Sequence, residues 1–199
     1  MASSTPYASL GGAVLSFLIV AADAASPVPA ASPKAAASGK AYTLQAACKR
    51  TGHYDLCVAS LSRDPSSRAA RELDAVALAR LAVQATQRNA SETSTYLSSL
   101  ATDDVLGDKT PQLQQCLDDC GERYEAAVEQ LTDAATAMDA GEFAESEALV
   151  ASSQAEVKMC QHQCHAVPGH QNILTVRNRE VDRLCSIALD ITRLIPAPK

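Results

Sequence analysis

The sequence contains no tryptophan, and aromatic residues make up only 4% of its 199 residues. A surface that stacks sugar rings or nucleic-acid bases on aromatic side chains is therefore disfavoured. The sequence also lacks a block of basic residues, and its formal net charge is −6. Nucleic acids and anionic membranes attract positively charged surfaces, so the composition argues against both as partners.

A long apolar run is missing as well. The longest, Ser9 to Val20 (SLGGAVLSFLIV), is shorter than the roughly 20 residues that a membrane-spanning helix needs. The small residues Ala22-Asp23-Ala24 follow it and are typical of a signal-peptide cleavage site. The residues before the run include no Lys or Arg, which is unusual for a signal peptide, and the lack of Arg disfavours a mitochondrial presequence. We predict a secretory signal peptide at 1–24 and no membrane segment after its removal.

Proline, alanine and serine dominate the next segment, residues 25–41, which shows no apolar periodicity. Such a composition predicts a disordered lead-in. The remaining part, residues 42–196, is long enough to build its own hydrophobic core. We expect it to form a single domain.

The sequence has seven cysteines. Behind a signal peptide, this number indicates an oxidising compartment and structural disulfides. The sequon Asn89-Ala90-Ser91 fits the same compartment, and Asn89 is a candidate for glycosylation. These features together predict a small secreted protein.

Four of the cysteines form two pairs, Cys116 with Cys120 and Cys160 with Cys164, each with a spacing that places both residues on one helix face. The pairs are symmetric about residue 140, next to Gly141. An antiparallel helical hairpin that turns there would bring Cys116 to Cys164 and Cys120 to Cys160. We interpret the pattern as a hairpin closed by two disulfides one turn apart, with the connectivity left for the structure to decide.

A zinc site is the alternative interpretation of these cysteines, with His162 and His165 as further ligands. Cys48, His53 and Cys57 form a smaller set of the same kind. Closed zinc sites usually have four ligands at finger-like spacing, and an oxidising compartment favours disulfides. We therefore expect neither a metal nor any other cofactor.

Apolar residues recur at spacings of three and four and predict four long helices with short connections, at 67–100, 110–138, 143–164 and 172–195. An irregularity is expected within the first of these, at 89–91. Before them, Thr51-Gly52-His53 separates two short helices within 43–61. No segment alternates convincingly as a strand. The predicted fold class is all-α: an up-and-down four-helix bundle, disulfide-stapled and preceded by a short N-terminal helical hairpin.

These features resemble the plant invertase and pectin methylesterase inhibitor family, whose members are small secreted bundles of this kind. Cys48 and Cys57, in ACKRTGHYDLC, are similar to the family's first pair, which closes the N-terminal hairpin. Cys120, in LDDCGERYEAAVEQL, matches the third cysteine, which is followed by a tyrosine, here Tyr124. Cys160 takes the place of the fourth, which the family joins to the third. The resemblance covers 43–195 and implies secretion to the apoplast or cell wall, with the vacuole as the other location.

The sequence departs from the family pattern at three cysteines. Cys116 and Cys164 are additional, and we interpret them as a second staple beside the family one. Cys185 is left over, and its neighbours Leu184 and Ala188 predict a partly buried, inert free thiol. An intermolecular disulfide through Cys185 is the alternative.

The resemblance implies a protein that binds a carbohydrate enzyme and performs no chemistry itself. Invertase inhibitors carry a Pro-Lys-Phe motif in the turn of the stapled hairpin, where this sequence has Gly141-Glu142-Phe143. A Glu in place of Lys would repel an active site built of carboxylates. The arm after the turn, FAESEALVASSQAEVKMC, nevertheless resembles the invertase inhibitors more. We expect an invertase as target, pectin methylesterase as the alternative, and Asp139, Glu142 and Phe143 as contact residues.

Two other classes of protein are disfavoured. Twin Cys-x3-Cys chaperones of the mitochondrial intermembrane space pair their cysteines in the same way, but they have shorter arms, no cleavable secretory leader and no third cysteine pair. An enzyme is disfavoured because no nucleophile stands in a recognisable motif.

Overall fold

The computed structural model describes residues 40–102, 109–165, 167 and 174–196. The predicted signal peptide, almost all of the predicted lead-in, and the first residues of the last predicted helix lie outside the described residues. No helix in the described ranges is long and apolar enough to cross a membrane.

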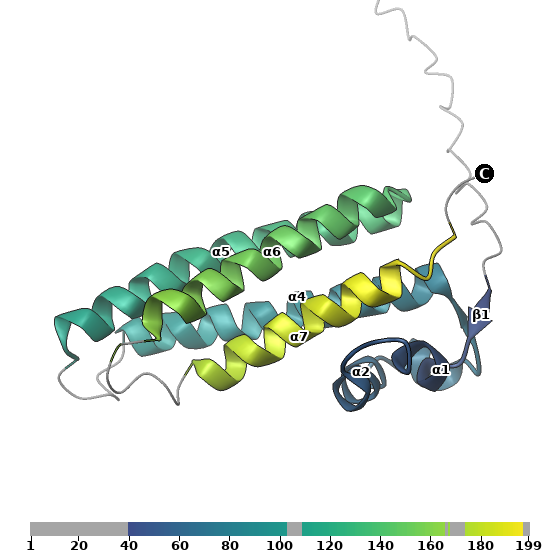
Figure 1. Ribbon diagram of the computed structural model, residues 1–199, viewed down its shortest axis with the longest axis horizontal. Helices are drawn as coiled ribbons and strands as arrows, with labels where there is room; N and C mark the ends of the chain where they lie inside the picture. The colour runs from purple at the N-terminus through teal and green to yellow at the C-terminus, as the bar shows by residue number, and fades with distance from the viewer. Residues whose placement is uncertain (1–39, 103–108, 166, 168–173, 197–199) are drawn as a thin grey trace, which may run out of the picture. The chain divides into compact units, whose positions relative to one another are not determined.

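Four long helices form the body of the fold (Figure 1): α4 Ala75–Thr102, α5 Pro111–Ala140, α6 Phe143–Cys164 and α7 Thr175–Thr192. Each packs against the helix that follows it, and α7 returns to pack against α4, which closes the bundle. The most extensive of these contacts joins α5 to α6. The predicted fold class, an all-α bundle with disulfides, is confirmed.

A smaller N-terminal part lies against one end of the bundle. It contains the helices α1 Leu44–Cys48, α2 Tyr54–Leu61 and α3 Pro65–Ala69. The expected helical hairpin corresponds to α1 and α2, which pack against each other and also contact α7.

The start of the first long helix was predicted wrongly. The sequence favours a helix from residue 67, whereas the structure ends α3 at Ala69 and forms a short antiparallel ribbon between β1 Ala41–Tyr42 and β2 Leu73–Asp74. α4 begins only after this ribbon, where the Asp74 carboxylate accepts a hydrogen bond from the Ala77 backbone N–H at 2.7 Å. Pairing with a strand more than thirty residues earlier is not visible in local periodicity. The expected irregularity near Asn89 is also absent, because α4 is continuous there.

The core is built from leucine, isoleucine, valine and alanine along the facing sides of the four helices. Small residues let α5 and α6 approach closely, and the buried Ser146 hydroxyl of α6 donates to the Ala134 carbonyl of α5 at 2.8 Å. This hydrogen bond satisfies a hydroxyl that would otherwise be costly to bury.

The turn between α5 and α6 depends on Gly141. Its φ of 80° lies in the left-handed region, which glycine adopts without a steric penalty. The Gly141 N–H donates to the Met138 carbonyl at 3.2 Å, and the Glu142 N–H donates to the Ala137 carbonyl at 2.9 Å. These two bonds satisfy carbonyls at the end of α5 that have no partner within the helix.

A matched pair of alanine substitutions tests this reading of the turn. Gly141→Ala should lower the free energy of unfolding by about 1–2 kcal/mol, the cost of a left-handed non-glycine residue. Gly121→Ala should raise it by about 0.5–1 kcal/mol, because Gly121 lies within α5 and glycine is a poor helix former. A Cβ at either position meets no atom within 4 Å, so packing does not enter. Urea unfolding measures both, and equal effects would contradict the turn geometry.

Candidate functional site

Two disulfides join α5 to α6 at the end of the hairpin opposite its turn. Cys116 is bonded to Cys164 and Cys120 to Cys160, with Cα–Cα distances of 5.4 and 4.8 Å. All four residues are buried. This is the pairing that the symmetric spacing predicts, outer with outer and inner with inner. A third disulfide, Cys48–Cys57, joins α1 to α2.

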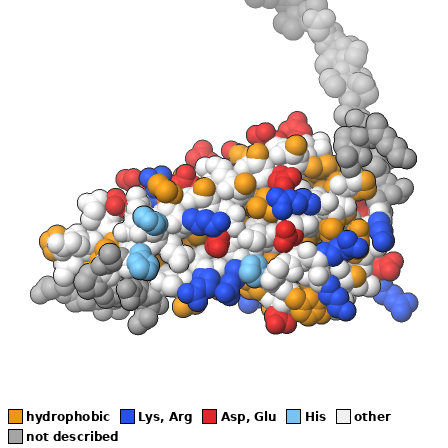
Figure 2. Space-filling view, viewed as in Figure 1, with side chains coloured by type: hydrophobic (Ala, Val, Ile, Leu, Met, Phe, Trp, Pro, Cys, Tyr) orange, Lys and Arg blue, Asp and Glu red, His pale blue; other side chains and the backbone are white. Residues whose placement is uncertain are grey.

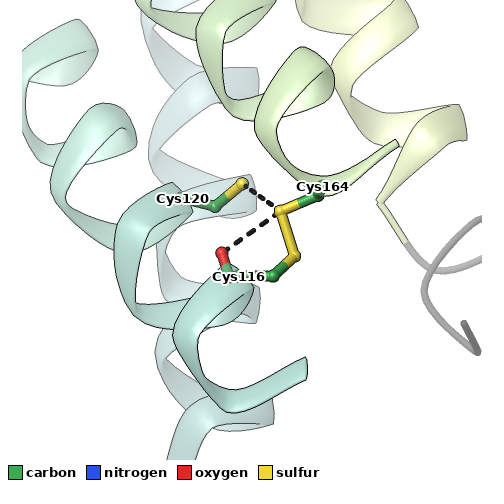
Figure 3. Close-up of side chains that lie close together, drawn as sticks. All are labelled: Cys116, Cys120 and Cys164. Carbon is green, nitrogen blue, oxygen red and sulfur yellow. Dashed lines mark hydrogen bonds between the residues drawn. A yellow bond between two sulfur atoms is a disulfide. The ribbon is translucent and has the colours of Figure 1, made fainter. Parts of the chain in front are cut away.

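The sulfurs of the hairpin form a compact cluster (Figure 3). The ligand atoms of Cys116, Cys120 and Cys164 lie within 4.8 Å of one another. Sulfurs in disulfides offer no thiolate to a metal, so in this oxidised state the cluster is a covalent staple. His162 and His165, the other ligands considered for zinc, are exposed and line a surface hollow with Lys158 and Gln161.

The tip of the hairpin carries the predicted contact residues. Asp139 and Glu142 are exposed at the end of α5 and the start of α6. Asp139 is paired with Arg80 of α4, a partner that the sequence gave no means of finding. Beside them lies an open groove of about 260 Å³, whose walls include the acidic Asp133, Glu142 and Glu145 and the apolar Ala137 and Leu149.

Phe143 is the third predicted contact residue. It is the first residue of α6, is half-buried, and packs against the hydrophobic core. Phe143 therefore supports the tip from inside and exposes only part of its ring. The groove residues on α5 were missed by the sequence analysis. Their spacing over Asp133, Ala137 and Ala140 places them on one helix face and was the available signal.

Charge is divided between the two sides of the bundle. Figure 2 shows acidic side chains along the edge formed by α5 and α6, and Lys and Arg side chains over α7 and the N-terminal helices. An acidic tip therefore belongs to a larger acidic edge, and a partner of this edge would need complementary positive groups.

A buried polar network ties the staple to α7. The Tyr124 hydroxyl donates to Asn178 Oδ1 at 2.9 Å, and Asn178 Nδ2 lies 3.3 Å from Cys160 Sγ. Tyr124 and Asn178 are both fully buried. Burial raises the pKa of Tyr124 far above its usual value, so the phenol stays neutral and keeps its proton as a donor. Tyr124, the tyrosine that follows Cys120, thus has a clear structural role.

The other predicted site residues lie elsewhere. Asn89 is half-buried on α4, and its Nδ2, the atom that a glycan would modify, donates to Glu180 Oε1 of α7 at 3.2 Å. Cys185 is a free and fully buried thiol on α7. Burial, followed by the nearby Asp182 carboxylate, raises the pKa of Cys185 to about 12.

The fold and the stapled hairpin define the class of protein: a disulfide-rich four-helix bundle that presents a preformed tip. The profile of the plant invertase/pectin methylesterase inhibitor family matches residues 42–191. The chain belongs to this family. Because the match spans nearly the whole described part, the alternative of a mitochondrial chaperone has no support.

Curated relatives carry both kinds of inhibitor name. The chain is 27% identical over 150 residues to "Cell wall / vacuolar inhibitor of fructosidase 2" of Arabidopsis thaliana, which covers 74% of this chain and 80% of the relative. It is 30% identical over 181 residues to "Pectinesterase inhibitor 28" of Oryza sativa subsp. japonica, over 85% of this chain and 76% of the relative. The relatives are named as inhibitors of enzymes.

A solved structure has the same fold. The crystal structure of a pectin methylesterase inhibitor from Arabidopsis thaliana superposes with a TM-score of 0.58 at 20% identity, over 78% of this chain and 97% of that one. A mutant form of such an inhibitor gives a TM-score of 0.63 at 21% identity, over 76% and 95%. At these identities the likeness establishes the fold alone.

Cys185 should be inert in the folded protein. We expect iodoacetamide to leave it unmodified at pH 8.5 under native conditions and to alkylate it in denaturant. The thiol ionises more easily in the unfolded chain, so its contribution to stability is complete below about pH 9 and is lost as pH rises toward 12. The loss should approach about 1.4 kcal/mol per pH unit in urea unfolding, relative to Cys185→Ala. Native alkylation at the denatured rate would contradict this burial.

Proposed function

We propose that this protein is a secreted inhibitor that binds an invertase (β-fructofuranosidase) of the plant cell wall or vacuole and blocks its active site. The α5–α6 hairpin carries the proposal, since it is the one element held by two disulfides and it presents an exposed tip. Family membership and the relative named as a fructosidase inhibitor support the same target.

The hairpin suits an inhibitor because it is ordered before binding. A partner that is already rigid loses less conformational entropy on association, which strengthens binding without new contacts. The disulfides fix one end of the two helices, and the left-handed Gly141 with its two hydrogen bonds fixes the other. No chemistry is required of the inhibitor in this mechanism.

We assign the contact to Asp139, Glu142 and Phe143 at the tip. Asp139 is already paired with Arg80, so part of its charge is neutralised within the protein. Glu142 has no ion pair with a described residue and brings a negative charge to the place where invertase inhibitors carry Lys. Phe143 contributes the exposed part of its ring as an apolar anchor.

Pectin methylesterase is the second candidate target. The observation that favours it is the acidic edge of α5 and α6, which gives an active site built of carboxylates no electrostatic attraction at this tip. The rice relative named as a pectinesterase inhibitor supports this candidate.

Secretion and processing belong to the same proposal. The predicted signal peptide would direct the chain to the apoplast, the cell wall or the vacuole, where the disulfides would form. Glycosylation of Asn89 stays a prediction, and a glycan on its Nδ2 would replace the hydrogen bond to Glu180.

An inhibition assay tests the function. The purified, oxidised protein should reduce the activity of an acid invertase at acidic pH in proportion to its concentration and leave pectin methylesterase unaffected. Inhibition of pectin methylesterase alone would select the second candidate. Inhibition of neither enzyme would overturn the proposal and leave the fold assignment intact.

Variants at the tip test the contact residues. Glu142→Lys should strengthen invertase inhibition on the order of tenfold, because it replaces repulsion of the active-site carboxylates by attraction. Glu125→Lys is the matched control, since it makes the same charge change at an exposed position on α5 nearer the disulfides. Phe143→Ala should weaken inhibition, with circular dichroism to confirm that the half-buried position still folds. Equal effects of the two lysine variants, or unchanged inhibition by Phe143→Ala, would remove the tip from the interface.

A further inference from the structure

The second disulfide adds less stability than its length in the sequence suggests. Cys120–Cys160 closes a sequence separation of 40 residues, and Cys116–Cys164 one of 48. In the chain-entropy treatment either bond alone would stabilise the fold by about 4 kcal/mol. Once one bond is closed, however, the other closes only the short segments between them, which is worth about 2 kcal/mol. The neighbouring staple therefore invites a chemical explanation as well as a mechanical one.

The two disulfides touch each other. Cys164 Sγ, which is bonded to Cys116, lies 3.3 Å from Cys120 Sγ, which is bonded to Cys160. Figure 3 shows this contact as a dashed line beside the Cys116–Cys164 bond. At this distance a thiolate on Cys164 would be in contact with a sulfur of the inner disulfide.

The four cysteines differ in their access to solvent. Cys116 is 5% exposed, whereas Cys120, Cys160 and Cys164 are 0% exposed. A thiol reagent approaching from solvent therefore meets Cys116 first. The inner disulfide has no direct access from outside in the folded protein.

The geometry points to a thiol–disulfide relay, in which the outer disulfide is the site of reaction with a dithiol reductant and passes the exchange to the buried inner disulfide. First, a reductant thiolate attacks Cys116 Sγ; the Cys116–Cys164 bond breaks and Cys164 leaves as a thiolate. Released from its partner, the Cys164 side chain can rotate into line with the inner disulfide. Its thiolate then attacks Cys120 Sγ; the Cys120–Cys164 bond forms, the Cys120–Cys160 bond breaks, and Cys160 leaves as a thiolate and takes up a proton.

The surroundings of Cys160 favour this second step. A disulfide sulfur leaves faster when its thiolate is stabilised. Asn178 Nδ2 lies 3.3 Å from Cys160 Sγ, and the Tyr124 hydroxyl, bonded to Asn178 Oδ1, orients the amide so that its N–H groups face the sulfur. A buried hydrogen-bond donor is therefore already in place for the leaving group.

The second thiol of the reductant completes the reaction. It attacks the sulfur of the reductant that is bonded to Cys116, so the reductant leaves as a disulfide and Cys116 is released as a thiol. Electrons balance: one dithiol is oxidised, and the hairpin exchanges its native pair of disulfides for a single Cys120–Cys164 bond with Cys116 and Cys160 reduced. The hairpin keeps one covalent link throughout.

Single cysteine variants provide the sharpest test. Cys116→Ala leaves the Cys164 thiol beside the inner disulfide, and after incubation of the folded protein at pH 8 without reductant we expect both Cys120–Cys160 and Cys120–Cys164 pairings. Cys164→Ala is the matched control, because it also removes one sulfur and one disulfide but leaves Cys116 as the free thiol. It should keep Cys120–Cys160 alone. Acid quenching, alkylation and mass spectrometry of non-reduced peptides identify the pairings, and circular dichroism verifies folding.

The unsubstituted protein gives a second measurement that does not depend on the folding of a variant. During limited treatment of the folded protein with dithiothreitol, quenched samples should contain a species with a Cys120–Cys164 bond and alkylated Cys116 and Cys160. Identical native pairing in the two alanine variants would overturn the relay. So would a time course in which Cys120–Cys160 opens without any Cys120–Cys164 species.

Discussion

The covalent joining of α5 to α6 is the constraint on which the rest of the bundle depends. The two helices make the most extensive contact of the fold, and α4 and α7 pack against them and against each other. The disulfides act at one end only, because about twenty residues of α5, roughly 30 Å of helix, separate Cys120 from the turn. At the other end, order comes from Gly141 and from the Ser146–Ala134 hydrogen bond, which are local and non-covalent.

The same arrangement explains how a protein without catalytic machinery of its own can act on an enzyme. A tip held at the end of two stapled helices presents a fixed surface, and a fixed surface binds with a smaller entropic cost. The identity of the side chains at that tip then decides the target. Here the tip is acidic, and Arg80 already engages one of its carboxylates. Target selection in this family member therefore depends on a few charges carried by a common scaffold.

Polar groups inside the bundle link the staple to the last helix. Tyr124 on α5, Asn178 on α7 and Cys160 on α6 form one buried chain of contacts. Leaving any of these polar groups unpaired in the core would cost about 1–3 kcal/mol, so the network specifies how α7 is placed against the hairpin. It also gives the inner disulfide a polar neighbour, which connects the packing of the core to the chemistry of its sulfurs.

The sequence by itself determined the features that follow from spacing: the long helices, the turn at Gly141, and the pairing of Cys116 with Cys164 and Cys120 with Cys160. These are set by helical periodicity and by the symmetry of the cysteines about the turn. Only the tertiary structure decided the features that join distant residues. Leu73 leaves the expected helix because it pairs with Tyr42, Asp139 is engaged by Arg80, and Asn178 faces the inner disulfide. Each partner lies far away in the sequence, and local patterns carry no information about contacts that form only when the helices pack.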